Sequence, residues 1–449
     1  MTDAANLELA RVEEVLDSRW PETQIEPSLD RISRLVELLA DPHLAYPVIH
    51  VTGTNGKTST SRMIESLLRE MGLNTGLVTS PHLHSLTERI RLNGEPISAE
   101  RFVEAYDELE PFLAMVDSES IAEGGPAMSY FEVLTGLAFA VFADAPVDVA
   151  IVEVGLGGEW DATNVVQPVV SVITPIGIDH TDYLGDTIEE IAQAKAGIIK
   201  PGVSAVLAHQ TPEAAEVLLR RCAEVDAIVA REGVEFAVAE RQLALGGQVV
   251  SFKGLNSDYA DVLIPLYGVH QASNASVALA AVEAFFGAER PLSEESVRAG
   301  FANVTSPGRL EVVRRSPTVI IDAAHNPHGA AVLAEALDES FAFEYIIGVV
   351  SVMGDKDVSG VLDALEPVFN EVVVTWNGVA RAMQSDEIAA IAADRFGNDR
   401  VHAEPNLSSA IDKAIELADN AGTTGVGVVI TGSVVTASAA RALLGHTNV

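Results

Sequence analysis

Short apolar runs alternate with amphipathic stretches from residue 47 onward. Two of the runs, 147–155 and 169–177, are nearly continuous in β-branched residues, as expected of parallel strands buried on both faces. The stretch 57–72 repeats apolar residues at helical spacing and ends at a glycine that stops the helix. Alternation of this kind predicts βαβ units and a doubly wound sheet. Further strands are predicted at 47–53 and 74–80, and a largely buried helix at 129–144.

The pattern changes on both sides of this region. Residues 1–47 have apolar residues at helical spacing and predict a helical lead-in. Residues 203–265 are more irregular, and their short strand candidates predict an antiparallel side sheet. A helix is predicted to follow at 271–287.

Turn residues cluster at 303–311, and a second α/β series begins after them. We therefore predict an α/β protein with two domains. The larger, at 1–306, is a doubly wound N-terminal domain, and the smaller, at 307–449, is a Rossmann-like C-terminal α/β domain. The strands predicted in the second domain are 318–324, 344–352, 371–376 and 425–433.

Composition narrows the class of protein. The hydrophobic share of 48% and the charged share of 21% are those of a globular protein in water. A net charge of -37 argues against a nucleic-acid partner, because nucleic-acid binding usually leaves a basic footprint. Cys222 is the one cysteine, so no disulfide can form within the chain, which fits a reducing cytoplasm.

No apolar run approaches the about 20 residues that span a bilayer. The acidic, amphipathic stretch 1–16 lacks the basic and apolar regions of a secretory signal. We therefore expect a cytoplasmic protein that binds neither membrane nor nucleic acid, and we take a monomer as the default oligomeric state.

The stretch GTNGKTS, at 53–59, lies between a predicted strand and a predicted helix, as a phosphate-binding loop (P-loop) requires. Lys57 would reach the terminal phosphates of ATP or GTP, and the hydroxyl of Thr58 or Ser59 would face Mg²⁺. The usual G-x-x-x-x-G-K-[ST] pattern has glycine where this chain has Val51, so the loop is a shorter variant.

Polar residues also end two other predicted strands, at the sheet edge where open α/β sheets bind ligands. Glu153 interrupts a buried run, and a buried carboxylate needs a cation beside it. Asp179 and His180 follow the next strand. Glu153 and His180 are thus candidate Mg²⁺ ligands, although Mg²⁺ prefers oxygen, and the alternative is a salt-bridged glutamate with a capping histidine. Lys195 ends an acidic helix and, from the residues alone, is a solvated lysine or half of a surface ion pair.

The second predicted domain has two similar strand-to-helix junctions. One carries Asp322, His325 and Asn326, and the other carries Gly432 and Ser433. Small residues at such turns let backbone amides approach an anion. Each junction is equally consistent with a structural turn.

Taken in order, these stretches resemble the folylpolyglutamate synthase and dihydrofolate synthase family, a branch of the Mur-type ATP-dependent amide ligases. The resemblance extends over nearly the full chain. Its markers are GTNGK (53–57), TSPHL (79–83), ERIRLNGEPIS (88–98), YFEVLTGLAF (130–139), EVGLGGEWDATN (153–164), the stretch from IGIDH to KPG (176–202), HQASNA (270–275), PGRLE (307–311) and DAAHNPHG (322–329).

The resemblance implies an ATP site, a Mg²⁺ site and two catalytic lysines. Lys57 is the lysine of the phosphate loop, and Lys195 matches the lysine that the family carbamylates with CO₂. The ATP-binding residues implied are Thr54, Asn55, Gly56, Lys57, Thr58, Ser59, Asn274, Arg309 and Asp322. The metal ligands implied are Ser80, Glu153 and His180, with Ser59 as the hydroxyl from the loop.

It also implies sites for the pterin and for L-glutamate. The pterin-binding residues implied are Ile25, Glu26, Pro27, Ser129, Tyr130, Phe131, Glu132, Trp160, Asp161 and Ala162. The residues implied for glutamate are His325 and Ser433, with His325 also counted as catalytic.

The activity implied is ATP-dependent addition of L-glutamate to dihydropteroate, to reduced folates, or to both, through an acyl phosphate, and we favour both. Three residues depart from the family pattern. Thr58 and Ala323 stand where the folate enzymes usually have glycine, and Glu159 stands where they usually have arginine. The last change reverses a charge beside the expected pterin region.

Two other functions are weighed against this one. Thr58 favours a peptidoglycan Mur ligase, but about 50 residues before the loop are too few for the additional domain of those enzymes. A regulatory ATPase would explain the phosphate loop and would leave Lys195 and Asp322 without a role.

Overall fold

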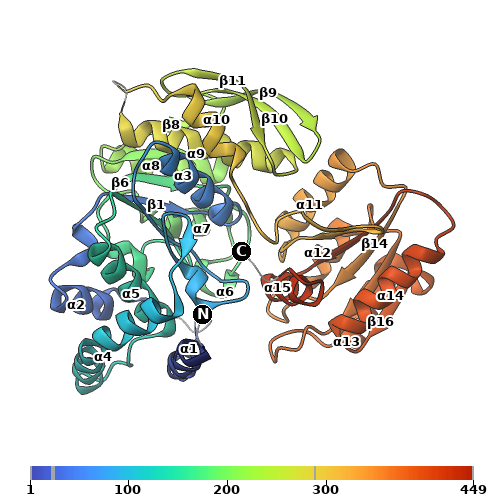
Figure 1. Ribbon diagram of the computed structural model, residues 1–449, viewed down its shortest axis with the longest axis horizontal. Coiled ribbons are helices and arrows are strands. Elements are labelled where there is room, and N and C mark those ends of the chain that lie inside the picture. The colour runs from blue at the N-terminus through green and yellow to red at the C-terminus, as the bar shows by residue number, and fades with distance from the viewer. Residues whose placement is uncertain (1–2, 22–25, 288–289, 447–449) are drawn as a thin grey trace.

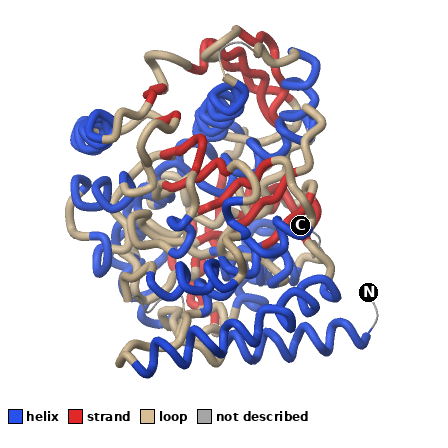
Figure 2. The backbone as a smooth tube through the Cα atoms, turned by 90° about the vertical axis from the view of Figure 1, so that its left-hand side faces the viewer, coloured by secondary structure: helices blue, strands red, loops and turns tan. Residues whose placement is uncertain are grey.

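The computed structural model of the protein describes residues 3–21, 26–287 and 290–446. In this part of the chain two α/β units lie side by side, with the C-terminal unit in orange to red in Figure 1. Figure 2 shows most strands in the interior and helices packed outside them. The predicted α/β class is confirmed, because each unit has a largely parallel sheet.

Eight strands of the described chain form the central sheet of the first unit, in the order β4-β3-β2-β5-β1-β6-β7-β8. Six are parallel, and β3 and β4 pair antiparallel at one edge. We expected the region from 203 to be irregular, but β7 and β8 extend the parallel sheet. The strands are β1 (Val48–Thr52), β2 (Thr75–Val78), β3 (Ile90–Leu92), β4 (Glu95–Pro96), β5 (Val149–Glu153), β6 (Pro168–Ile173), β7 (Ser204–Leu207) and β8 (Ile228–Arg231).

Helices cover both faces of this sheet because side chains alternate along each strand. Val48 of β1 packs in one apolar cluster with α1, α2, α4 and α5, whereas Ile49 and Val51 pack on the opposite face with α3, α9 and α10. The helices are α1 (Asp3–Asp17), α2 (Asp30–Leu38), α3 (Lys57–Glu70), α4 (Ala99–Ala122), α5 (Tyr130–Asp144), α6 (Thr181–Leu184), α7 (Ile188–Ala196), α8 (Pro212–Glu224), α9 (Val269–Phe286) and α10 (Glu294–Ala302).

The predicted side sheet is present and antiparallel, in the order β11-β10-β9. Its inner face shares a core with α9 and α10, where the rings of Phe252 and Phe301 stack at 5.6 Å between centroids. The strands are β9 (Ala237–Ala244), β10 (Gly247–Lys253) and β11 (Asp258–Ile264).

The second unit has a sheet in the order β12-β13-β17-β14-β15-β16, parallel except for β12. Its four inner strands match the predicted ones, and the edge strands β12 and β16 were not predicted. The strands are β12 (Glu311–Arg315), β13 (Thr318–Ile321), β14 (Tyr345–Val350), β15 (Glu371–Thr375), β16 (Val401–Glu404) and β17 (Val426–Thr431). The helices are α11 (Pro327–Ser340), α12 (Val358–Leu365), α13 (Ser385–Phe396), α14 (Leu407–Asn420) and α15 (Val434–Leu443). No helix in the described ranges is long and apolar enough to cross a bilayer.

The two units touch on both sides of the space between them. On one side, Arg241 of β9 forms an ion pair with Glu339 of α11. On the other, the loop after β2 meets α15, where Arg441 Nη1 lies 2.8 Å from His84 Nε2 and Ser438 Oγ donates to the carbonyl of Leu83.

Candidate active site

The carboxyl ends of both sheets face a cavity of about 840 Å³. The loops after β1, β5 and β6 enter it from the first unit, and those after β13, β14 and β17 enter it from the second. Every predicted site residue that the structure describes lines this cavity except Pro27 and Tyr130. Ile25 lies outside the described residues. Residues far apart in the chain thus meet in one site: for example, Asn55 Nδ2 lies 2.9 Å from His328 Nδ1, 273 positions later.

The phosphate loop is held by contacts that leave no room for larger residues. Gly56, with φ 88°, precedes the first residue of α3, and a Cβ there would lie 2.6 Å from the Asn274 side chain. A Cβ on Gly53 would lie 1.9 Å from Thr174 Oγ1. The amide of Thr54 donates to the carbonyl of Pro175 at 2.9 Å. The loop is therefore fixed in place, and the start of α3, whose first residues line the cavity, offers a position suited to phosphate.

Lys57 folds back over this loop. Its ammonium donates to the carbonyls of Gly53 at 3.0 Å and Thr54 at 3.2 Å. Burial lowers the pKa of Lys57, and the charges of Glu153 and Asp179 oppose that change. A buried ammonium held by carbonyls alone is ready to move to a stronger anionic partner.

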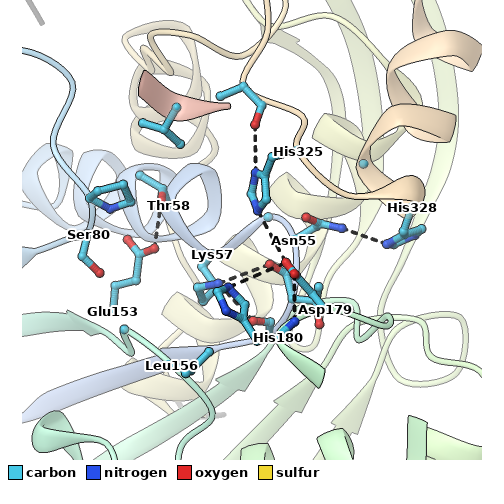
Figure 3. A pocket seen from close by; sticks show the side chains of 18 of the residues that line it. Asn55, Lys57, Thr58, Ser80, Glu153, Leu156, Asp179, His180, His325 and His328 are labelled. Carbon is cyan, nitrogen blue, oxygen red and sulfur yellow. Dashed lines mark hydrogen bonds and ion pairs between the residues drawn. The ribbon is translucent and has the colours of Figure 1, made fainter. Parts of the chain in front are cut away.

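Glu153 ends β5 beside the loop, and one of its oxygens has no partner. Thr58 Oγ1 donates to Glu153 Oε1 at 2.8 Å, while Oε2 is buried without a hydrogen bond in the described structure. Burial raises the pKa of Glu153 to about 7, although the Lys57 charge opposes the change. Ser80 lies beside Glu153 and Thr58 in Figure 3. Ser59 Oγ instead faces Ser306 Oγ, at 2.9 Å.

These groups suit a small divalent cation. A buried carboxylate oxygen without a donor needs a positive charge. Among the residues described, no group of three or more His, Cys, Asp or Glu side chains is placed to hold a metal. The protein would therefore supply few ligands, and hydroxyls, phosphate and water would supply the rest, as is usual for Mg²⁺.

Asp179 joins the two units at the centre of the cavity (Figure 3). Its oxygens accept from Lys356 Nζ at 2.6 Å and from Asn326 Nδ2 at 3.0 Å, and its Oδ2 lies 3.5 Å from His325 Nε2. Burial alone would raise the pKa of Asp179, but the hydrogen bond from His325 and the charge of Lys356 lower it well below its ordinary value. Asp179 is therefore ionised and takes contacts from three residues of the second unit.

His180 lies next to this group with a left-handed backbone, at φ 53°. Its Nε2 is 3.2 Å from Lys356 Nζ. Although 39% of its side chain is exposed, partial burial of the ring and the charge of Lys356 lower the pKa of His180 to about 4, against the opposing charge of Asp179. The ring is therefore neutral near pH 7 and accepts a hydrogen bond from Lys356, so a metal at Nε2 would have to displace that ammonium.

Lys195 is buried, which corrects the expectation of a solvated lysine. It lies in the last turn of α7, and its ammonium donates to the carbonyl of Gly53 at 2.9 Å. Burial and the nearby charge of Lys57 lower the pKa of Lys195 to about 7. A substantial fraction of this amine is therefore neutral at physiological pH.

The second unit presents Asp322 and Ser433 to the cavity, and both already make hydrogen bonds. Asp322 accepts from the amides of Leu310, at 2.9 Å, and Ala324, at 2.8 Å, which ties the segment between the units to β13. Ser433 Oγ accepts from the amide of Thr436 at 3.0 Å and caps α15.

The predicted pterin residues form the end of the cavity near α5. Ser129 and Glu132 make a capping box at the start of that helix. Glu132 also accepts from Arg31 Nε at 3.1 Å, and the Arg31 guanidinium lies 5.5 Å from the ring centre of Trp20. Asp161 is buried, and its carboxylate accepts from the amides of Leu156 and Thr163, each at 2.9 Å.

Some expectations are corrected here, and some functional candidates were missed. Glu159 is exposed and does not line the cavity. Glutamate in place of the family's usual arginine at this position therefore does not change the charge of the cavity wall. Trp20, Arg31 and Lys356 line the cavity but were not predicted. Arg31 was missed because it lies in an amphipathic helix, where arginine usually marks a solvated face.

Comparisons with known proteins agree with this arrangement. The Mur ligase middle domain matches residues 51–107 and 128–282, and the Mur ligase, glutamate ligase domain matches residues 308–434. Dihydrofolate synthase/folylpolyglutamate synthase of Mycobacterium tuberculosis is 56% identical over 458 residues, which cover 98% of this chain and 94% of that protein.

Two solved structures are similar along the full length. Mycobacterium tuberculosis folylpolyglutamate synthase complexed with ADP and AMPPCP is 55% identical, with a TM-score of 0.94 and coverage of 98% of this chain and 99% of that one. An FPGS–AMPPCP–folate complex is 31% identical, with a TM-score of 0.82 and coverage of 97% and 99%. This chain therefore belongs to the folylpolyglutamate synthase/dihydrofolate synthase branch of the Mur ligases, the family that its sequence motifs predicted.

Proposed function

We propose that the protein uses ATP to join L-glutamate to the carboxyl group of dihydropteroate and of reduced folates, and so carries out both activities in the name of its Mycobacterium tuberculosis relative. The observation that carries the proposal is the shared cavity. Lys57 and Glu153 reach it from the first unit, and Asp322, His325 and Lys356 reach it from the second. A cytoplasmic location and a monomeric state remain predictions from the sequence.

ATP would place its phosphates on the loop from Thr54 to Ser59, with Asn274, Arg309 and Asp322 around the rest of the nucleotide. Glu153, Ser80 and His180 would hold Mg²⁺. We assign the loop hydroxyl to Thr58 in place of Ser59, because Thr58 Oγ1 already contacts Glu153 whereas Ser59 Oγ faces Ser306. An ion held by these residues would neutralise charge on the phosphates.

The chemistry then follows from positions and charges. A carboxylate oxygen of the pterin substrate attacks the γ-phosphorus of ATP, and the bond between the γ-phosphorus and the β-phosphate oxygen breaks. The products are ADP and an acyl phosphate of the pterin substrate. Lys57 moves from its carbonyl partners to the transferring phosphoryl group. The neutral amine of glutamate attacks the acyl carbon, loses a proton and expels inorganic phosphate. An acyl phosphate hydrolyses in water. Because both units surround the cavity, they can keep water away from this intermediate.

Lys195 would carry a carbamate. Its pKa of about 7 leaves neutral amine to attack CO₂, and loss of one proton gives an anionic N-carboxylate. That group would replace the ammonium that now contacts Gly53, and would bring a negative charge toward the metal site. The buried position of Lys195 supports this proposal, since a solvated lysine keeps its proton near pH 7.

The two organic substrates would occupy opposite ends of the cavity. The pterin would lie near Glu26, Phe131, Glu132 and Trp160, where aromatic rings and a carboxylate line the wall. L-Glutamate would lie near His325, with Ser433 contributing from the start of α15. Pro27 and Tyr130 do not line the cavity, so any contact with the pterin from them requires movement.

The test is phosphate release by the purified protein with ATP, Mg²⁺ and L-glutamate. We expect release on adding dihydropteroate, and release again when tetrahydrofolate is supplied in its place. Silence with both acceptors would remove the folate assignment. Release that needs neither an acceptor nor glutamate would instead identify a regulatory ATPase, and release with a peptidoglycan precursor alone would identify the Mur alternative.

A further inference from the structure

A second, smaller cavity of about 40 Å³ lies beside the phosphate loop. It shares Thr58, Pro81 and Arg309 with the large cavity, so the two adjoin at the loop. About 10–15 Å³ is enough for one water, so this space suits a small tetrahedral ion and is too small for a pterin, an adenine or a glutamate. Thr58, at the shared wall, lies beside Glu153 in Figure 3.

Two guanidinium groups in its wall lack a carboxylate at ion-pair distance within the part of the chain that the structure describes, and the charges of Glu65, Glu88 and Glu153 act on Arg62 only from further away. Arg62 comes from the second turn of α3 and Arg309 from the segment between the units. Among the described residues, neither guanidinium makes a hydrogen bond or an ion pair. Burial and the charge of Arg91 lower the pKa of Arg62 to about 10, so it still carries its charge at pH 7. Two unpaired cations beside one small space call for an anion.

A third donor comes from the loop after β2. Arg89 Nε donates to His82 Nδ1 at 2.9 Å, so the proton of the neutral His82 ring lies on Nε2. In the described structure Nε2 has no partner of its own, and the ring lines the cavity.

The carboxylate in this wall is already satisfied. Glu88 accepts from the amides of Leu83 and His84, each at 2.9 Å, and from that of Ser85 at 2.8 Å. It therefore holds the loop that presents His82, and its oxygens are turned to those amides.

We propose that this cavity is a second oxyanion site, formed by Arg62, Arg309 and His82, that takes inorganic phosphate. Its occupant in the reaction would be the phosphate expelled when the amide forms, an identification that rests on the proposed function. The position beside Thr58 gives that phosphate a short path away from the nucleotide, and the guanidinium of Arg62 is the group that no other proposed step uses.

The experiment is calorimetric titration of the full-length protein with sodium phosphate, with Mg²⁺ and saturating AMPPCP present so that the phosphate loop is filled. We expect the wild type to bind one phosphate and Arg62→Gln to bind it at least about tenfold more weakly, as loss of a charged hydrogen bond implies. Arg69→Gln changes net charge equally on an exposed site of the same helix and is expected to bind like the wild type. Arg62→Lys keeps the charge and serves if Arg62→Gln does not fold.

Equal phosphate affinity in the wild type and both Arg62 variants would overturn the proposal. So would acetate binding that depends on Arg62 when phosphate does not bind, because the site would then serve a carboxylate. AMPPCP binding is measured first, in a separate titration. A wild type that binds AMPPCP but no phosphate contradicts this inference alone, whereas one that does not bind AMPPCP contradicts the proposed function.

Discussion

Replacing Glu153 with glutamine separates the stability of the metal-free protein from its use of Mg²⁺. The carboxyl is buried, and its pKa is about 7 against an ordinary 4.5. Keeping it ionised in the folded chain at pH 8 therefore costs about 3 kcal/mol. Glutamine has no charge to desolvate, and its oxygen can still accept from Thr58.

The sign of the pH dependence follows from the proton count. Between pH 4.5 and 7 the folded protein binds this proton and the unfolded chain has released it, so the wild type loses stability as pH rises through that window. At pH 5 the cost is under about 1 kcal/mol, and at pH 8 it is complete. The variant lacks this loss, so its stability relative to the wild type should rise by about 2–3 kcal/mol between pH 5 and pH 8.

Urea unfolding of both proteins at the two pH values, with EDTA present, measures this difference. Any constant effect of the new amide cancels, because it is the same at both pH values. Mg²⁺ with AMPPCP should then stabilise the wild type and leave the variant nearly unchanged. Parallel pH profiles would refute the assignment of a raised pKa to Glu153, and equal stabilisation by Mg²⁺ and AMPPCP would refute its role as a ligand.

Three further predictions follow from neighbouring contacts. Lys195→Ala should lose about 10- to 100-fold in rate and recover partly with added short-chain carboxylates; a rate equal to that of the wild type would rule out the carbamate. Thr58→Val should weaken Mg²⁺-dependent AMPPCP binding, measured by titration, about tenfold, whereas Ser59→Ala should not weaken it. Weaker binding by Ser59→Ala and not by Thr58→Val would assign the metal-binding hydroxyl to Ser59. His50 is buried with its pKa lowered to about 3, so acidification from pH 7 to 5 should cost the wild type about 2 kcal/mol that His50→Gln does not lose; equal urea-unfolding losses would contradict this.

The strands and the phosphate loop were predictable because their signals are local. A continuous apolar run such as 147–155 indicates a strand buried on both faces from its own residues alone. A glycine turn between a strand and a helix is likewise recognised from its own residues. Edge strands such as β12 and β16 carry weaker patterns, since none of their residues is fully buried. The antiparallel side sheet was recognised from short strand candidates, and in β11 buried residues are interspersed with exposed ones.

The environment of individual side chains was less predictable, because it depends on distant partners. Lys195 looked solvated in its helix, but the loop at Gly53 covers it from 142 positions away. Lys356 carries no local signal, and its partner Asp179 lies 177 positions earlier. The resemblance to known ligases supplied Lys195 and not Lys356, since it transfers only residues whose role is already known in the family.

The carboxylate of Asp179 has a consequence for building chimeras. One residue of the first unit takes its contacts from a lysine, a histidine and an asparagine of the second. In a chimera with the C-terminal unit of another ligase, Asp179 would lose these contacts unless that unit has the same three residues at equivalent positions. Recombination at the junction near residue 306 should yield working hybrids in proportion to how faithfully that trio is retained, more than to overall sequence likeness.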